Sequence, residues 1–312
     1  MKKHLSVSEL IQQNKQKSRA FASIREKTIP FILFICAVIS VFTTLGIIFT
    51  LLFETFTFFN RVPFIEFITS KEWLPFFESD PSYGILPLLS GTLVVAVIAM
   101  VAAIPLGLTA AIYLSEYASE RTKRTLKPIL EVLAGIPTIV YGFFALTFVT
   151  PLLQKFIPDL SFFNALSPGI VVGIMIIPMV ASLSEDAMNA VPNSIREGAL
   201  GLGATRFEVA FKIVLPAALS GIIASFVLAI SRAIGETMIV TIAGGATPTL
   251  GFDVTSSIQT MTAYIVQVSL GDAAYGSTIY YSIYAVGITL FVFTLIMNLL
   301  AQYISKKFRE AY

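Results

Sequence analysis

Charged side chains are scarce in this sequence. Asp, Glu, Lys and Arg make up 13% of its 312 residues, whereas a soluble globular domain carries about 25%. Hydrophobic residues reach 56%. This composition excludes a soluble globular domain and predicts an integral membrane protein with one membrane domain.

Cysteine and histidine are almost absent, with only Cys36 and His4 present. One residue of each kind excludes a disulfide framework and a Cys/His metal site, and it argues against a membrane enzyme. The phosphate-binding pattern G-x-x-x-x-G-K-[ST] is also missing. The chain is therefore not expected to bind ATP through such a loop, and we expect no cofactor in it.

Six apolar runs are each long enough to cross a bilayer as a helix. They lie near Pro30–Phe53, Ile85–Leu114, Val132–Leu153, Leu160–Ser184, Ala217–Val240 and Thr278–Ile304. The first run is too long for a signal-peptide core, so we expect it to be a retained span. The sequence predicts an all-α polytopic protein with a basic tail (1–28), a six-helix membrane domain (29–305) and a second tail (306–312).

The distribution of positive charge predicts the orientation. Of the 21 Lys and Arg residues, 17 fall in the two tails, the connection 121–127 and the stretch 193–216. The alternate connections hold only Arg61, Lys71 and Lys155. Because cytoplasmic loops are enriched in Lys and Arg, both termini and the stretch 193–216 are expected in the cytoplasm.

The stretch Asn193–Pro216 contains two S/T-x-x-E patterns, Ser194 with Glu197 and Thr205 with Glu208. In such a capping box the hydroxyl and the carboxylate each accept a hydrogen bond from a backbone N–H at a helix start. The two patterns therefore predict two short helices. An ordinary amphipathic surface loop is the alternative interpretation.

Gly201 and Gly203 lie between these two patterns, where the chain must leave one helix and turn into the next. Pro216 then begins the following apolar run, and a missing N–H costs little at a helix start. We therefore predict two helices joined by a glycine turn at the cytoplasmic surface.

Arg232 and Glu236 are the charges expected deep within a span, four residues apart on one face of the fifth helix. An Arg at mid-bilayer costs ~2.5–3.5 kcal/mol, so it is expected to face a cavity. Its guanidinium matches phosphate oxygens. Glu236 would neutralise Arg232 in an empty site or accept a hydrogen bond from a protonated oxyanion. A structural ion pair between the two is the alternative.

The stretch 193–216 resembles the EAA loop of ABC-importer permeases, whose pattern is E-A-A, three residues, G, nine residues and I-x-L-P. The matching positions are Glu197, Ala199, Gly203, Ile213, Leu215 and Pro216. Gly198 replaces the first Ala of the pattern. The resemblance implies a type I importer permease that docks through this loop onto a separate ATPase subunit, which binds ATP and magnesium.

The segments Leu133–Leu146 and Ser231–Met238 resemble the C-type permeases of phosphate-specific transport systems. This resemblance covers about Tyr83–Gln302 and implies a permease subunit, not an enzyme, in the cell membrane. It implies an A-type permease as heterodimer partner, two ATPase subunits and an extracytoplasmic phosphate-binding protein. It also implies that Arg232 and Glu236 act in phosphate passage. A permease for molybdate or sulfate, or an ion-coupled secondary transporter, is the alternative.

Overall fold

The computed structural model describes residues 7–77 and 79–307, and it divides into two units, residues 1–53 and 54–312. The first unit is helical, because α1 (Val7–Phe59) begins in it and continues into the second. No break in α1 separates the predicted tail from the predicted first span. Most of the predicted C-terminal tail lies outside the described residues.

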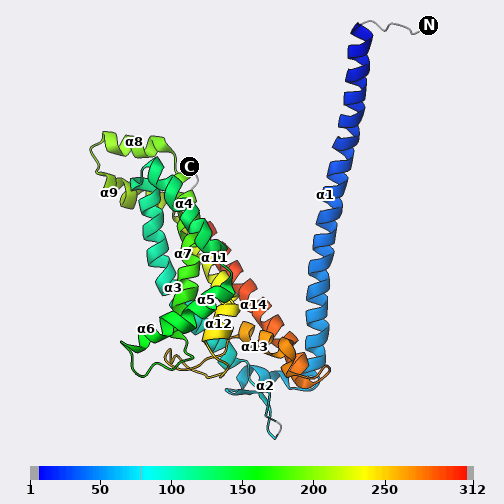
Figure 1. Cartoon of the computed structure of the whole chain (residues 1–312), viewed down its shortest axis with the longest axis vertical. Helices are drawn as coiled ribbons and strands as arrows, with labels where there is room; N and C mark the ends of the chain where they lie inside the picture. The colour runs from blue at the N-terminus through cyan, green and yellow to red at the C-terminus, as the bar shows by residue number, and fades with distance from the viewer. Residues whose placement is uncertain (1–6, 78, 308–312) are drawn as a thin grey trace, which may run out of the picture. The chain divides into compact units, whose positions relative to one another are not determined.

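The second unit is almost entirely helical (Figure 1). In chain order it contains α2 (Phe64–Thr69), β1 (Trp73–Leu74), β2 (Ser82–Tyr83), α3 (Leu86–Ile112), η1 (Tyr113–Tyr117), α4 (Glu120–Gly135), α5 (Thr138–Phe144), η2 (Ala145–Val149), α6 (Thr150–Gln154), α7 (Leu166–Asn189), α8 (Asn193–Gly201), α9 (Arg206–Glu208), η3 (Val209–Val214), α10 (Leu215–Ala217), α11 (Leu219–Ile234), α12 (Met238–Ala243), α13 (Met261–Gln267), η4 (Val268–Asp272) and α14 (Thr278–Lys307). The four η segments are π-helical, and β1 pairs antiparallel with β2.

Within the described residues, four helices are long and apolar enough to cross a membrane: Thr28–Phe59, Leu86–Tyr117, Leu166–Asn189 and Thr278–Ile304. Two further helix pairs reach the same apolar length only together, because each is bent at a short break. The bends measure 87° and 70°. The structure thus has four such spans, or up to six when each bent pair is counted as one, and six is the predicted number.

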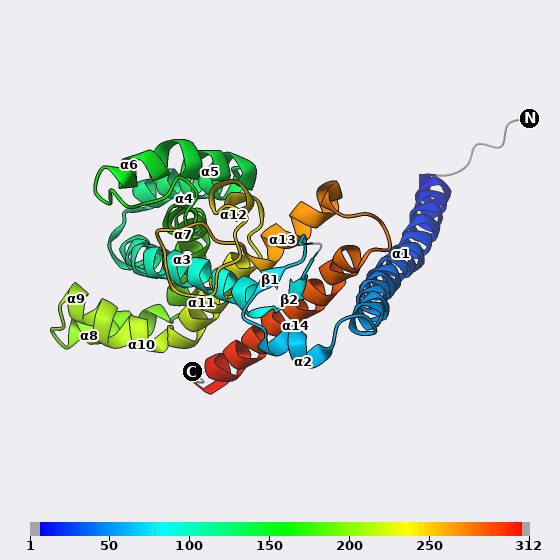
Figure 2. The same ribbon diagram turned by 90° about the horizontal axis from the view of Figure 1, so that it is seen from below.

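Helix α7 lies at the centre of the second unit, with α3, α4, α5, α11 and α12 packed against it (Figure 2). Its side chains Val171, Val172 and Ile176 are fully buried. A Cβ added at Gly173 would lie 2.8 Å from the carbonyl oxygen of Ala99 in α3. The lack of a side chain at Gly173 therefore allows α3 and α7 to approach closely, as small residues do in membrane helix pairs.

The predicted third span, Val132–Leu153, is wrong at its start. Its first residues belong to α4, and the chain then bends by 87° before Thr138–Gln154. Ile136 at the bend is extended, with ψ 130°. It precedes Pro137, and a residue before proline is disfavoured in the helical region. The basic connection 121–127 is accordingly part of a helix, α4.

An aromatic cluster fixes α13 against the strand pair. Trp73 and Tyr83, which face each other in the β1–β2 pair, are both buried. The ring of Tyr264 in α13 contacts that of Trp73 edge-on, with 4.9 Å between centroids. The Tyr264 hydroxyl also bonds to Ser282 in α14 at 2.6 Å. These contacts hold α13 beside the break in the fifth span, which is described below.

Candidate functional site

The EAA-like stretch begins with α8, whose first residue is Asn193. Pro192 precedes it in an extended conformation (φ −58°, ψ 137°), and no side chain caps this end. The predicted capping box of Ser194 and Glu197 is therefore wrong. Because Pro192 ends the extended segment and α8 begins directly after it, Ser194 lies inside the first turn and cannot be the cap.

The glycine turn after α8 is confirmed. Gly203 has φ +88°, a left-handed conformation that glycine adopts without a Cβ clash. Its N–H donates to the carbonyl of Leu200 at 3.0 Å, and the N–H of Ala204 donates to that of Ala199 at 3.1 Å. These two bonds are the pair of a Schellman motif, which ends a helix and reverses the chain. Gly201 is the last residue of α8.

The second capping box is also confirmed. The Thr205 hydroxyl accepts from the N–H of Glu208 at 3.3 Å, and Glu208 Oε2 accepts from the N–H of Thr205 at 3.1 Å. The backbone bond from Thr205, together with the nearby Lys212 ammonium, lowers the pKa of Glu208 to about 2. Glu208 therefore stays ionised at physiological pH, and the start of α9 is insensitive to pH in that range.

The second helix of the stretch is longer than predicted. From Arg206 it continues through η3 and α10 as far as Ala217, and a 70° bend separates it from α11. Pro216 lies within α10 rather than at the start of the span helix, which begins at Leu219. No sequence motif predicts the π-helical segment η3.

Apolar side chains are exposed around the turn between the two helices. Leu202 is 91% exposed and Phe207 60% exposed. The ring of Phe207 lies against that of Phe211, with 4.5 Å between centroids. We call Leu202, Phe207 and Phe211 the docking patch. Glu197 and Gly198 are exposed on α8 as well, whereas Ala199 packs against a buried cluster with Val209 and Val214.

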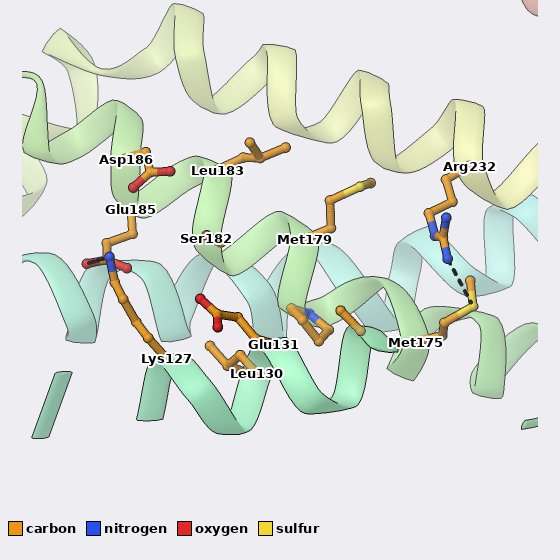
Figure 3. A pocket seen from close by; sticks show the side chains of 12 residues that line it. Lys127, Leu130, Glu131, Met175, Met179, Ser182, Leu183, Glu185, Asp186 and Arg232 are labelled. Atoms are coloured by element: carbon orange, nitrogen blue, oxygen red, sulfur yellow. Dashed lines mark hydrogen bonds and ion pairs between the residues drawn. The ribbon is translucent and has the colours of Figure 1, made fainter. Parts of the chain in front are cut away.

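A cavity of about 690 Å³ lies between α4, α7 and α11 (Figure 3). Arg232 of α11 lies at one end, and Lys127 of α4 lies at the other (Figure 3). The carboxylates that line it are Glu131 on α4 and Glu185 with Asp186 on α7. Because α8 follows α7 directly, the Lys127 end is the one toward the stretch 193–216, which we call the docking loop.

The Arg232 side chain is exposed to this cavity, and its guanidinium has no carboxylate partner among the described residues. Its Nη2 donates to Met175 Sδ at 3.9 Å, and a thioether is a weak acceptor. The predicted position of Arg232 in a cavity is therefore confirmed. The alternative of an ion pair with Glu236 is not what the structure shows.

Glu236 lies outside the cavity, between α11 and α12, where the predicted fifth span Ala217–Val240 is broken. α11 ends at Ile234 and α12 begins at Met238, so the prediction that Arg232 and Glu236 share one helix face is wrong. Glu236 is 7% exposed, and its Oε1 accepts from the N–H of Ile239 at 3.3 Å. A carboxylate suits the positive end of a helix, so Glu236 stabilises the start of α12.

The hydroxyl of Thr262 in α13 stabilises the break between α11 and α12 by donating a hydrogen bond to the carbonyl of Glu236 at 2.8 Å. This bond satisfies a backbone group that the interrupted helix leaves without a partner. Gly235, the weakest helix former at this point, precedes the carboxylate. Gly235 is thus the sequence signal for the break, but its effect depends on α13, which lies far away along the chain.

The cavity also contains an ion pair between Lys127 and Glu185, which the sequence did not predict. Lys127 Nζ lies 3.0 Å from Glu185 Oε1, which also accepts from Asn189 Nδ2 at 3.2 Å. Glu185 is only 1% exposed, although the predicted end of the fourth span at Ser184 would have left it in water. α7 in fact extends to Asn189. No local pattern pairs Lys127 with Glu185, because they belong to different helices.

Comparison with known proteins places this architecture in a family. Residues 103–310 match the model of the binding-protein-dependent transport system inner membrane component. The chain belongs to this family. It is 34% identical to the probable ABC transporter permease protein YqgH of Bacillus subtilis, over 98% of both chains.

Other relatives are named as phosphate permeases. The probable phosphate transport system permease protein PstC of Methanocaldococcus jannaschii is 33% identical, over 82% of this chain and 87% of its own. The PstC of Mesorhizobium japonicum is 32% identical, over 76% of this chain and 77% of its own.

Two solved transporters share the fold. A bacterial ABC transporter involved in alginate import matches with a TM-score of 0.59 at 17% identity, covering 96% of this chain and 99% of the other. The methionine transporter MetNI matches with a TM-score of 0.53 at 18% identity, covering 73% and 95%. The predicted fold, an all-α membrane protein of the ABC-importer permease type, is thus confirmed.

Family membership also determines the role of the chain. This protein is a multi-pass inner-membrane permease component of an ABC importer that works with a substrate-binding protein. It is not itself an enzyme, because ATP hydrolysis belongs to a separate subunit of such importers. An ion-coupled secondary transporter, one of the alternatives from the sequence, is therefore excluded.

Proposed function

We propose that this permease carries inorganic phosphate through the cavity between α4, α7 and α11 into the cytoplasm. The observation that carries the proposal is the exposed guanidinium of Arg232, which lines the cavity without an ion-pair partner among the described residues. Guanidinium groups bind phosphate oxygens in pairs through two parallel N–H bonds. The names of the PstC relatives support the same substrate.

The remaining charges of the cavity favour anion binding at Arg232 over the rest of the lining. Lys127 is paired with Glu185, so Arg232 is the cavity-lining cation that is free to bind an anion. Glu131 and Asp186 lie along the wall beyond it. Their charges repel an anion, so a phosphate in the cavity is expected to bind at Arg232 and not along that wall. Glu236, bonded to the start of α12, has a positioning role in this proposal.

Sulfate and molybdate remain the competing substrates, since a guanidinium attracts any oxyanion. In cells that depend on this importer, phosphate uptake is expected to be unaffected by a large excess of sulfate or molybdate. The measurement is uptake of radiolabelled phosphate with and without each competitor. Strong competition by either anion would transfer the assignment to that anion while leaving the permease role unchanged.

We also propose that α8 and α9 dock onto the ATPase subunit through the docking patch. ATP and magnesium are bound by two such subunits, and this chain contributes no cofactor of its own. An A-type permease completes the membrane heterodimer, and an extracytoplasmic phosphate-binding protein delivers the substrate. The exposure of Leu202 and Phe207 supports docking, because an exposed apolar cluster at a loop tip is typical of an interaction site.

Leu202→Asp is expected to release the ATPase subunit and abolish uptake without affecting the membrane domain. The side chain is 91% exposed, so the substitution removes no internal packing. A charge buried in an apolar interface opposes association. The measurement is co-purification of the ATPase, and Lys212→Gln, on the exposed face of the same loop, is the matched control. Full retention of the ATPase by Leu202→Asp would contradict docking through this patch.

A further inference from the structure

Two ion pairs lie between the docking loop and the cavity. The first joins Arg196 of α8 to Glu116 of η1 at 3.2 Å, with side chains 15% and 9% exposed. The second is the pair of Lys127 and Glu185 on the cavity wall, 3.0 Å apart. We call α8 the docking helix. The second span, the fourth span, α4 and the docking helix thus each contribute one residue to these two ion pairs.

Arg196 also fastens the docking helix to the end of α7. Its Nη2 donates to the carbonyl of Met188 at 2.6 Å, and its Nη1 donates to that of Val191 at 2.5 Å. These carbonyls belong to the last turn of α7 and the residues just after it, where the helix leaves acceptors unsatisfied. A displacement of α8 therefore acts directly on the end of α7 and on Glu116.

Two polar side chains bridge the ion pairs. The hydroxyl of Ser115 lies 2.8 Å from Glu116 Oε1 and 3.2 Å from Asn189 Oδ1. The amide of Asn189 in turn donates to Glu185 Oε1 at 3.2 Å. A hydroxyl has a single proton, so Ser115 donates to Glu116 or to Asn189 at any one time and links the two ion pairs by switching between them. We call these residues the coupling network: Arg196, Glu116, Ser115, Asn189, Glu185 and Lys127.

We infer that the coupling network transmits the movement of the docking helix to the wall of the transport cavity. Glu185 makes the connection sensitive, because its Oε2 is buried and accepts no hydrogen bond from the described residues. Lys127 and Asn189 stabilise the buried carboxylate through Oε1, and removing a partner of a buried charge is destabilising. When Asn189 shifts, Lys127 and α4 are therefore expected to rearrange so that Glu185 keeps its partners. A gradual weakening of the bonds to Glu185 is disfavoured.

This inference rests on the ATPase docking proposed above, but not on the substrate, and its test uses no phosphate. Ser182 lines the cavity and is exposed, so a Ser182→Cys variant in a Cys36→Ser background carries one reactive thiol in the cavity. The rate at which a reagent labels this thiol reports how accessible the cavity is. The complex with its ATPase, in lipid nanodiscs, is labelled with a maleimide in the presence and absence of a non-hydrolysable ATP analogue. The labelling rate is the readout.

In the parent complex the nucleotide is expected to change the labelling rate by at least about fivefold, the lower end of typical coupling between sites. Asn189→Ala and Ser115→Ala should reduce this change to less than about twofold while the ATPase still co-purifies. Asn189 is exposed and Glu185 keeps its ion pair with Lys127 in the Asn189→Ala variant, so the fold is expected to persist.

Two controls make the result specific. Ser115→Thr keeps the hydroxyl and should keep the nucleotide response. Lys123 lies one turn from Lys127, and its one ion pair among the described residues is with the exposed Glu120. Lys123→Gln should therefore also respond like the parent. A normal response in both Asn189→Ala and Ser115→Ala, or an equal loss in Lys123→Gln, would overturn the inference. No nucleotide effect in the parent would instead contradict the proposed docking.

Discussion

An Arg232→Ala variant is expected to assemble normally and to take up phosphate roughly a hundredfold more slowly. A hydrogen bond to a charged group contributes roughly 1.5–3 kcal/mol, and the guanidinium offers the phosphate a pair of such bonds. Assembly should be unaffected because the Arg232 side chain is exposed to the cavity, and among the described residues its guanidinium makes one hydrogen bond, to the sulfur of Met175. Arg232→Lys keeps the charge but not the planar fork, so it should show intermediate uptake.

Glu236→Gln is the matched comparison for Arg232→Ala. The amide oxygen of Gln can still accept from the N–H of Ile239, so the start of α12 stays capped and most of the uptake should remain. Glu236→Ala removes that acceptor and should lower stability by roughly 1 kcal/mol, as other lost helix caps do. Uptake of radiolabelled phosphate, normalised to assembled complex, is measured for each variant. Loss of uptake in assembled Glu236→Gln would show that the carboxylate acts on the substrate.

Gly203→Pro is expected to abolish uptake in a permease that still inserts in the membrane. Proline fixes φ near −65°, whereas Gly203 has φ +88°, and it removes the N–H that bonds to Leu200. The Schellman turn cannot form, so α8 and α9 lose the relative orientation on which docking depends. Uptake and ATPase co-purification are both measured, and both should be lost.

Gly201→Ala is the control for Gly203→Pro, because Gly201 is helical and a Cβ there would meet nothing within 4 Å. Alanine should stabilise α8 by up to about 1 kcal/mol and leave uptake unchanged. Normal uptake in Gly203→Pro would show that the turn is not needed for coupling. Equal loss in Gly201→Ala would show that the loop tolerates no change, whatever its backbone geometry.

Features encoded within a few residues were predicted correctly. The left-handed turn at Gly203 and the capping box of Thr205 and Glu208 each depend on local backbone groups, and the structure confirms both. The Ser194 box failed for a local reason too, since the residue that precedes α8 is Pro192, two residues before the predicted cap. Apolar length gave the number of spans, because hydropathy alone decides which segments are long enough.

Features that depend on contacts between helices were missed or misplaced. The break after Ile234 needs Thr262 of α13 to satisfy the carbonyl of Glu236, so a continuous fifth helix was the simpler prediction. Arg232 was placed in a cavity correctly, because the cost of burying its charge is independent of its neighbours. The pair of Lys127 and Glu185 joins two helices, and only the folded structure brings it together.

The most direct test of the proposed function is ATP-driven phosphate accumulation by the reconstituted complex. The two permeases and the ATPase are placed in proteoliposomes, with ATP on the side of the docking loop and the phosphate-binding protein on the other. Radiolabelled phosphate is expected to accumulate on the ATP side, with sulfate and molybdate not competing and with Arg232→Ala nearly inactive. ATP-dependent accumulation of another anion but not of phosphate, or full activity of the assembled Arg232→Ala complex, would contradict the account.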